Sequence, residues 1–294
     1  MKILAALGTT SQDAFVVNEV ARLAGNTWAD VTLLGVETGT SPEIPPFSAS
    51  FRSDESHPLV QSLRGLRGRF LSRFKAEESP YMETVVDHEL VEVESNLWED
   101  LNVLRSARKQ LVTRIRPGNA ARSILAEARQ FPCDLIVIGS SLDGDGNDIG
   151  RICRKVIHEA GTSVLVIAKT KLPQRIVACL DHDRVSQHSL EIINQMVTLY
   201  QADLEIVGVS TVETLPGEID DKMGQILKYY AQNGIRTLVR SVPRTSLEAF
   251  AAQASRENLV ALWMGRQSRL HRFITPRSMD RLLDNSDYSV LILR

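Results

Sequence analysis

The chain has 294 residues, of which 43% are hydrophobic and 24% are charged, and its formal net charge is −2 at pH 7. This composition is that of an ordinary folded protein, and the length suits two domains that each bury a core of their own. A chain so close to neutral creates no field that attracts a polyanion, so we do not expect a nucleic acid as partner.

The opening residues and the cysteines both favour a cytoplasmic protein. The start, MKILAAL, lacks the charged segment, the long apolar stretch and the cleavage site of a secretory signal. No segment approaches the roughly 18 apolar residues that a membrane span needs. Cys133, Cys153 and Cys179 have no C-x-x-C spacing and lie in or beside apolar segments, so we expect buried, reduced thiols.

An internal repeat organises the sequence. KILAALG at 2–8 matches RIVACLD at 175–181, and VTLLGVET at 31–38 matches LEIVGVST at 204–211, both with an offset of 173 residues. Later segments match with an offset of 126: LIVIGSS at 135–141 with ALWMGRQ at 261–267, and SVLVIAK at 163–169 with SVLILR at 289–294. The two offsets differ by 47, so the first copy carries about 47 extra residues between about 38 and 112. We expect a first domain at 1–170 and a second at 171–294.

The first predicted elements are a strand, a helix and a second strand. The apolar runs at 3–7 and 31–36 predict the two strands. Thr10 or Ser11 is the expected cap of the helix between them, and Gly25 its expected end. The apolar face of this helix would consist of Phe15, Val16, Val20 and Leu23.

The extra residues begin with a Pro- and Ser-rich stretch that predicts a loop. Apolar residues then recur at helical spacing, with basic residues around them: Leu59, Leu63, Leu66, Phe70 and Phe74, with Arg64, Arg67, Arg69, Arg73 and Lys75. We expect this helix to pack on its own domain or on the other one, and contact with lipid or nucleic acid stays open as an alternative. Residues from about Val85 to Arg108 are predicted to be helical and to correspond to the helix before the third strand.

The remaining elements alternate regularly. In the first copy we expect a strand at 110–115, a helix at 120–130, a strand at 135–138, a helix at 149–159 and a strand at 164–167. In the second copy we expect strands near 176–180, 204–209, 236–240, 259–264 and 290–293. Apolar strands separated by helices predict an α/β fold with two doubly wound, parallel, five-stranded sheets in tandem.

These segments together resemble the universal stress protein family in its tandem two-domain form. The resemblance rests on KILAALG and RIVACLD as first strands, on RPGNAARSILAEARQFPCDLIVIGSS, and on EAGTSVLVI and NSDYSVLIL as closing strands. It implies the adenine nucleotide alpha hydrolase-like fold. It also implies that the closing strands of the two domains pair, so we predict that 164–167 pairs with 290–293; a homodimer is a further option.

The resemblance also implies where a nucleotide would bind. In nucleotide-binding members, an aspartate ends the first strand, and a loop of pattern G-x-x-G, nine residues, then G-[ST] wraps the phosphates, because small residues let backbone N–H groups approach an anion. The first copy departs from this pattern, with Gly8 at the aspartate position and Leu142 at the second glycine. Its loop also carries Asp143, Asp145 and Asp148, whose charges would repel a phosphate. We expect no ATP there, and the spacing fails the calcium-loop pattern as well.

The second copy keeps more of the pattern. Asp181 and Gly265 stand at the matching positions, while Ser268 replaces the second glycine. Its loop is basic, and Thr275-Pro276 is a plausible cap and first residue of the next helix. The candidate ligand shell is Asp181, Val209, Gly265, Ser268 and Ser278, with ATP or another phosphorylated ligand as its occupant. The alternative is a solvated basic loop, with Asp181 capping the helix that follows it.

The sequence therefore supports several functions. It contains no G-x-S-x-G, no H-E-x-x-H and no complete P-loop, so we predict no catalytic residues and no metal site. The first hypothesis is a non-enzymatic, cytoplasmic stress-response protein with degenerate nucleotide loops. The second is a nucleotide-dependent switch or weak ATPase that acts through the second domain. The third is an adaptor that docks an unknown protein partner on the insertion.

Overall fold

The computed structural model divides into two compact units, Met1–Thr162 and Ser163–Arg294. It describes residues 1–10, 12–37, 57–75, 79–81, 88–102, 108–140, 147–168, 172–181, 185–210, 216–265 and 268–294. In these residues, no helix combines the length and the apolar character needed to cross a membrane. The acidic loop with Asp143 and Asp145 lies outside the described residues.

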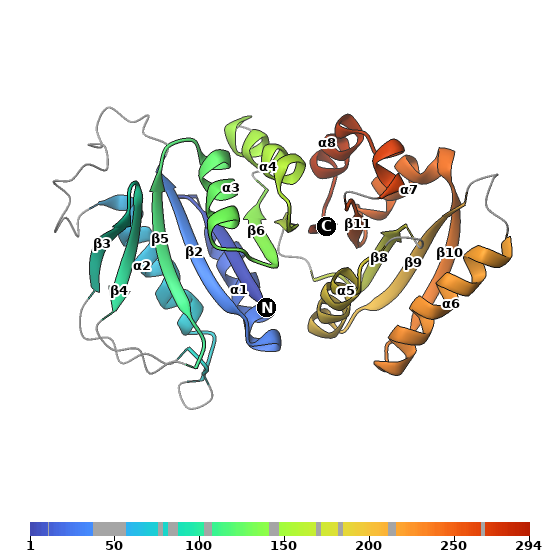
Figure 1. Cartoon of the computed structure of the whole chain (residues 1–294), viewed down its shortest axis with the longest axis horizontal. Coiled ribbons are helices and arrows are strands. Elements are labelled where there is room, and N and C mark those ends of the chain that lie inside the picture. The colour runs from blue at the N-terminus through green and yellow to red at the C-terminus, as the bar shows by residue number, and fades with distance from the viewer. Residues whose placement is uncertain are drawn as a thin grey trace. The chain divides into compact units, whose positions relative to one another are not determined.

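The first unit alternates strands and helices, as Figure 1 shows in blue to green. Its elements are β1 (Lys2–Leu7), α1 (Asp13–Thr27), β2 (Asp30–Glu37), α2 (Pro58–Leu71), β3 (His88–Glu94), β4 (Leu97–Asn102), β5 (Leu111–Pro117), α3 (Ala120–Gln130), β6 (Leu135–Gly139) and α4 (Asn147–Glu159). The strands lie in the order β6-β1-β2-β5-β4-β3. From β6 to β5 all pairings are parallel, whereas β4 pairs antiparallel with both β5 and β3.

The second unit repeats this plan without the hairpin β3–β4. Its elements are β7 (Ser163–Ile167), β8 (Arg175–Leu180), α5 (Gln187–Tyr200), β9 (Asp203–Ser210), α6 (Pro216–Gln232), β10 (Thr237–Pro243), α7 (Leu247–Ala254), β11 (Leu259–Trp263), α8 (Pro276–Asp284) and β12 (Val290–Leu293), with short 3-10 helices at Arg244–Ser246 and Arg269–Arg272. The strands lie in the order β10-β9-β8-β11-β12-β7. The doubly wound α/β fold is therefore confirmed.

The predicted pairing of the closing strands is present within the second unit. β7 runs antiparallel to β12, with Val166 opposite Val290 and Val164 opposite Ile292. Both strands are buried along their whole length. β7 is grouped with the second compact unit, although its residues fall in the segment 1–170 that the sequence assigned to the first domain. The extent of the two domains stays a prediction.

The prediction of a helix from about Val85 to Arg108 was wrong. Where the structure describes this stretch, it forms the antiparallel hairpin β3–β4, with Asn96 at the turn in the left-handed region, φ 60°. The sequence HELVEVE alternates apolar and acidic residues with the period of a strand, and asparagine tolerates positive φ. The helix before the third parallel strand is α2, so the hairpin is the element that the second unit lacks.

The basic helix packs on its own unit, which is the first of the predicted alternatives. Arg64 lies 3.6 Å from the carboxylate of Asp100 on β4, and Arg67 donates a hydrogen bond of 2.7 Å to the carbonyl of Leu111. Leu63 and Phe70 are buried beneath it. The arginines of this helix therefore help to attach the hairpin and β5 to the rest of the unit.

Local details near α1 differ from the predictions. The N-cap is Gln12, whose side chain makes no capping bond, rather than Thr10, and Ser11 lies outside the described residues. The helix continues past Gly25 and ends at Thr27. Helix ends are the least determined part of a sequence pattern, because several neighbouring polar residues can serve as caps.

The cysteines are free, and two of the three are buried as predicted. Burial raises the pKa of the Cys153 and Cys179 thiols to about 12. Cys133 has intermediate exposure. Thiols held in the neutral form are poor nucleophiles, so Cys153 and Cys179 act as packing residues.

Equivalent glycines allow a helix to lie close to the sheet in each unit. A Cβ on Gly35 of β2 would lie 2.6 Å from Leu63 Cδ1, and Leu63 is only 1% exposed. A Cβ on Gly208, the matching residue of β9, would lie 2.7 Å from the terminal methyl of Met223. Leucine at a packed position cannot move aside easily, whereas the end of a methionine side chain can.

We predict that Gly35→Ala lowers the free energy of unfolding by about 1–3 kcal/mol through overpacking. Gly208→Ala should have a smaller effect, because only the flexible end of Met223 must move. Gly65→Ala on α2, where a Cβ meets nothing within 4 Å, serves as control and should stabilise the helix by about 0.5–1 kcal/mol. Urea unfolding of the three variants measures the change in the free energy of unfolding. An equal loss of stability in Gly35→Ala and Gly65→Ala would contradict the prediction.

Candidate functional site

The predicted ligand residues of the second unit lie at one edge of its sheet. β8 runs parallel to both β9 and β11, with Leu180 opposite Gly208. The carboxyl ends of these three neighbouring strands therefore meet at the same edge, which is where open α/β sheets bind ligands. Asp181 follows β8 directly, Val209 is the second-last residue of β9, and Gly265 lies two residues beyond β11.

Asp181 is buried at this edge, with 4% of its surface exposed. Its carbonyl accepts a hydrogen bond of 3.1 Å from the Val185 N–H, which closes the turn after β8. The cap of the next helix, α5, is Ser186, which accepts from the Ser189 N–H at 3.1 Å. The alternative in which Asp181 caps this helix is therefore wrong.

Gly265 is in contact with an indole ring. A Cβ at this position would lie 2.9 Å from Cζ2 of Trp263, the last residue of β11. Trp263 is 4% exposed, and its Nε1 finds no hydrogen-bond acceptor within the described part of the chain. A buried indole N–H normally has a partner. The glycine thus makes room for Trp263, and Trp263 brings an unused donor to the strand ends.

Ser268 and Ser278 both use their hydroxyl groups in hydrogen bonds within the loop and its helix ends. Ser268 Oγ donates to the Trp263 carbonyl at 2.8 Å and accepts from the Leu270 N–H at 3.1 Å. The Ser278 N–H donates to Thr275 Oγ1 at 3.2 Å, and the two hydroxyls lie 2.8 Å apart. Thr275 is therefore the cap of α8, as predicted, with Pro276 at its first turn. These bonds order the loop itself.

Cations surround the loop. Arg272 and Arg277 are exposed, and the guanidinium of Arg244 lies over the Phe273 ring, 4.1 Å from its centroid. The Arg294 side chain donates a hydrogen bond to the Met264 carbonyl, and burial lowers the pKa of its guanidinium. Chemically, the edge can offer an indole N–H, the N-terminus of α8 and exposed arginines to an anion, whereas the Asp181 carboxylate suits a hydrogen-bond donor of the ligand. Whether the predicted residues hold a ligand stays a prediction.

The matching edge of the first unit is filled by its own side chains. A Cβ on Gly139 would lie 3.3 Å from Gln12 Oε1 and 3.2 Å from Val16. Asp13 accepts a hydrogen bond of 2.7 Å from the Thr10 N–H, and its carboxylate lies beside Gly8. Burial raises the pKa of Asp13 despite these contacts. The sequence did not single out Asp13, although an acidic residue in a first helical turn was a signal for it.

Metal ligation has no candidate in the described ranges. No group of three or more His, Cys, Asp or Glu side chains is placed there to hold a metal ion. The segment DHD at 181–183 has only its first residue described.

Comparisons with known proteins identify the family. The sequence profile of the Universal stress protein family matches residues 1–168, so the chain belongs to the universal stress protein family. A universal stress protein from Archaeoglobus fulgidus is 13% identical, with a TM-score of 0.59 over 100% of this chain and 96% of that chain. A functionally unknown protein from Pseudomonas aeruginosa is 15% identical, with a TM-score of 0.58 over 99% and 92%.

A third solved structure is similar in fold. The cytoplasmic domain of a prokaryotic cation chloride cotransporter is 11% identical, with a TM-score of 0.53 over 99% of this chain and 94% of that chain. No curated protein matches the sequence. At these identities the structural likeness shows the fold alone, and it does so over the length of both units.

Asp13 leads to a prediction about pH. The pKa of its carboxyl group in the folded protein lies above the ordinary value for aspartate because burial penalises the charged form. The folded state therefore binds the proton more tightly, and the wild type loses stability as pH rises through the folded pKa. We expect Asp13→Asn to be more stable than the wild type at pH 7, with the difference shrinking towards pH 4. Urea unfolding at several pH values measures this, and a pH-independent difference would contradict it.

Proposed function

We propose that the protein is a non-enzymatic regulatory protein of the stress response, located in the cytoplasm, with degenerate nucleotide loops. The observation that carries this is the use of the phosphate-loop positions of the second unit. Ser268 caps the short 3-10 helix that follows it, Ser278 is hydrogen-bonded to the α8 cap residue Thr275, and Gly265 accommodates the Trp263 ring. Groups that a nucleotide-binding loop would direct at phosphates are bonded to the protein itself. The cytoplasmic location rests on the sequence prediction.

The proposal includes the pairing of the two domains through their closing strands. An apolar edge strand needs a partner, and β7 from Val164 onwards and the whole of β12 are apolar. The antiparallel register between Leu165 and Leu291 supports such pairing. A homodimer remains a further option in the proposal.

A second candidate is a switch that binds ATP or another phosphorylated ligand at the second unit. The observation that favours it is the buried Trp263 Nε1 without an acceptor, at the edge where Asp181 and the N-terminus of α8 are also found. A ligand oxygen could accept from this indole. Exposed Arg272 and Arg277 could neutralise phosphate charge.

The adaptor hypothesis stays a prediction. The hairpin β3–β4, which the second unit lacks, covers β5 and is bonded to α2 and α3. A partner that docked on the insertion would have to use the outer surface of this hairpin or residues that the structure does not describe.

Thermal unfolding with and without Mg-ATP separates the first two candidates. If the protein is a non-nucleotide regulator, we expect no shift in Tm at millimolar Mg-ATP and no phosphate release. A switch would gain about 2.7 kcal/mol of stability when the ligand is at about 100 times its Kd. That gain would overturn the first proposal.

Matched variants show where any shift originates. Asp181→Ala should abolish a shift that arises at the predicted site. Asp203→Ala removes an exposed carboxylate from the start of β9, at the opposite end of the strand, and should leave the shift unchanged. A shift that survives Asp181→Ala would contradict the predicted ligand shell.

A further inference from the structure

The third parallel strands of the two units are equivalent but have different surroundings. β5 (LVTRIRP) and β10 (TLVRSVP) align with the repeat offset of 126, so Arg240 is the counterpart of Arg114. β5 has a covering strand: β4 pairs with it antiparallel, with Trp98 opposite Ile115 and Glu99 opposite Arg114. β10 is the last strand of its sheet in the described residues.

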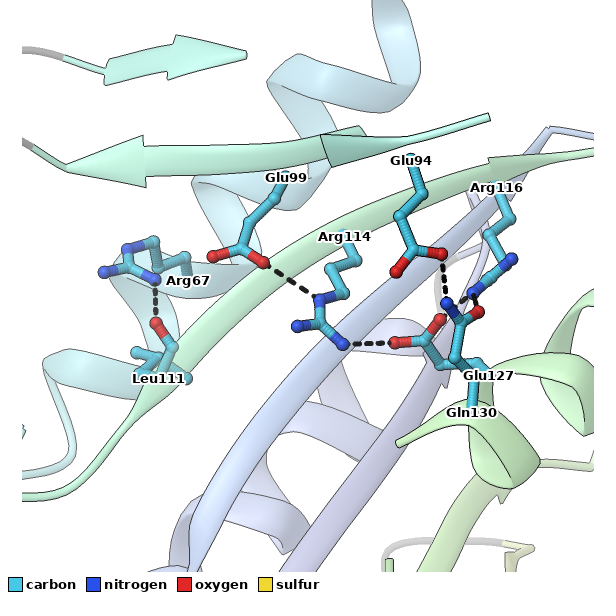
Figure 2. Close-up of polar contacts among 8 residues, drawn as sticks. All are labelled: Arg67, Glu94, Glu99, Leu111, Arg114, Arg116, Glu127 and Gln130. Atoms are coloured by element: carbon cyan, nitrogen blue, oxygen red, sulfur yellow. Dashed lines mark hydrogen bonds and ion pairs between the residues drawn. The ribbon is translucent and has the colours of Figure 1, made fainter. Parts of the chain in front are cut away.

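The covering strand in the first unit supplies a carboxylate to the arginine. Figure 2 shows Arg114 between Glu99 of β4 and Glu127 of α3. The distances are 3.1 Å to Glu99 and 2.8 Å to Glu127, and the guanidinium lies 3.7 Å from the centroid of the Phe131 ring. The arginine side chain is only 13% exposed as a result. The same hairpin is attached again where Glu94 accepts from Gln130 (Figure 2).

Arg240 also lies beside a carboxylate and an aromatic ring, supplied by other elements, but no described strand covers it. Its guanidinium lies 2.6 Å from the buried carboxylate of Glu205 on β9, and 5.5 Å from the Phe250 ring centroid. Yet 56% of the side chain is exposed, compared with 13% for Arg114. The side that Glu99 occupies in the first unit is open to solvent here.

Apolar side chains are exposed along the same strand. Leu238 and Val239 are 48% and 46% exposed, while their counterparts Val112 and Thr113 in the first unit are 7% and 2% exposed. Adjacent strand residues point to opposite faces of the sheet, so β10 is exposed on both faces of the sheet at these two residues. Arg236 and Arg244 are exposed at its two ends. The edge is therefore apolar in the middle and basic around it.

We propose that the β10 edge binds an extended segment of a partner protein as an added antiparallel strand. The segment carries a carboxylate that meets Arg240, as Glu99 meets Arg114, with bulky apolar residues beside it that cover Leu238 and Val239. Main-chain hydrogen bonds supply affinity in this mode, and the side chains supply specificity. A second β10 is a poor occupant, because two-fold pairing would bring the same basic residues together. This docking edge is separate from the strand-end site.

The test uses a synthetic, fluorescently labelled peptide with the sequence of residues 96–102, NLWEDLN, which contains the strand that covers β5. We expect the full-length protein to bind it in fluorescence anisotropy, with a Kd below about 1 mM. A peptide with Glu99→Arg should bind about tenfold more weakly, because its charge meets Arg240. Two further peptides carry a methyl group on the backbone nitrogen of Glu99 or of Asp100. Their affinities should differ, because only alternate N–H groups of an added strand point towards β10 and donate to it.

Protein variants locate the peptide. Leu238→Glu should weaken binding about tenfold or more through lost apolar contact and charge repulsion. Gln187→Glu, at an exposed position of α5, introduces the same charge elsewhere and should leave binding unchanged. Circular dichroism checks folding, and Val239→Glu replaces Leu238→Glu if that variant is unfolded.

Three outcomes would overturn the proposal. The first is the absence of peptide binding up to about 1 mM. The second is equal binding to the wild type and to the folded edge variant. The third is self-association of the wild type that the edge variant abolishes in analytical ultracentrifugation, which would assign the edge to a second copy of the chain.

Discussion

Backbone N–H and C=O groups at the edge of a β-sheet need partners, and an apolar edge strand also needs cover from water. Each unit meets this constraint with an added antiparallel strand at one edge. In the first unit, β4 covers β5, and in the second, β7 covers β12. β4 belongs to the hairpin that the second unit lacks, whereas β7 is the strand that matches β12 in the internal repeat. β10, by contrast, remains at an edge with exposed apolar side chains.

Covering an edge also changes the electrostatics of the covered residues. The Arg114 side chain is largely buried beside β4. An arginine buried without carboxylates would destabilise the fold strongly. Glu127, only 1% exposed, and Glu99 provide two charge-assisted hydrogen bonds in its place. In the second unit the buried counter-charge comes from Glu205 on the neighbouring strand, at a position where the repeat offset of 173 gives Thr32 in the first unit. The arginine is common to both units, whereas the element that neutralises it differs.

The strands and most helices could be predicted because their signals are local. Apolar runs mark strands in a parallel sheet, and α3 has the predicted bounds, Ala120–Gln130, because Asn119 caps it. The hairpin was missed because the repeat led us to expect a helix before the third strand, although HELVEVE has the period of a strand. The strand-end rule placed Asp181 and Gly265 at one edge, since it depends only on strand order.

Other parts of the site depend on contacts between distant residues, which no local pattern encodes. The hydrogen bond from Ser268 Oγ to the Trp263 carbonyl forms only because the loop turns back towards the end of β11. The proximity of Asp13 to Gly8 likewise depends on the turn before α1.

Trp263 limits what the second unit can bind. A phosphate that approached the backbone at Gly265 would meet the indole, because the space of the missing Cβ is already within 2.9 Å of the ring. Moving a buried aromatic side chain away costs about 1.5–3 kcal/mol of apolar burial. A hydrogen bond from Nε1 to the ligand would return only about 0.5–1.5 kcal/mol. Binding that displaced the ring would therefore be weakened, whereas a ligand that accepted from Nε1 with the ring in place would avoid this cost. The geometry thus favours a small anion or a ligand at the rim over a nucleotide wrapped by the loop.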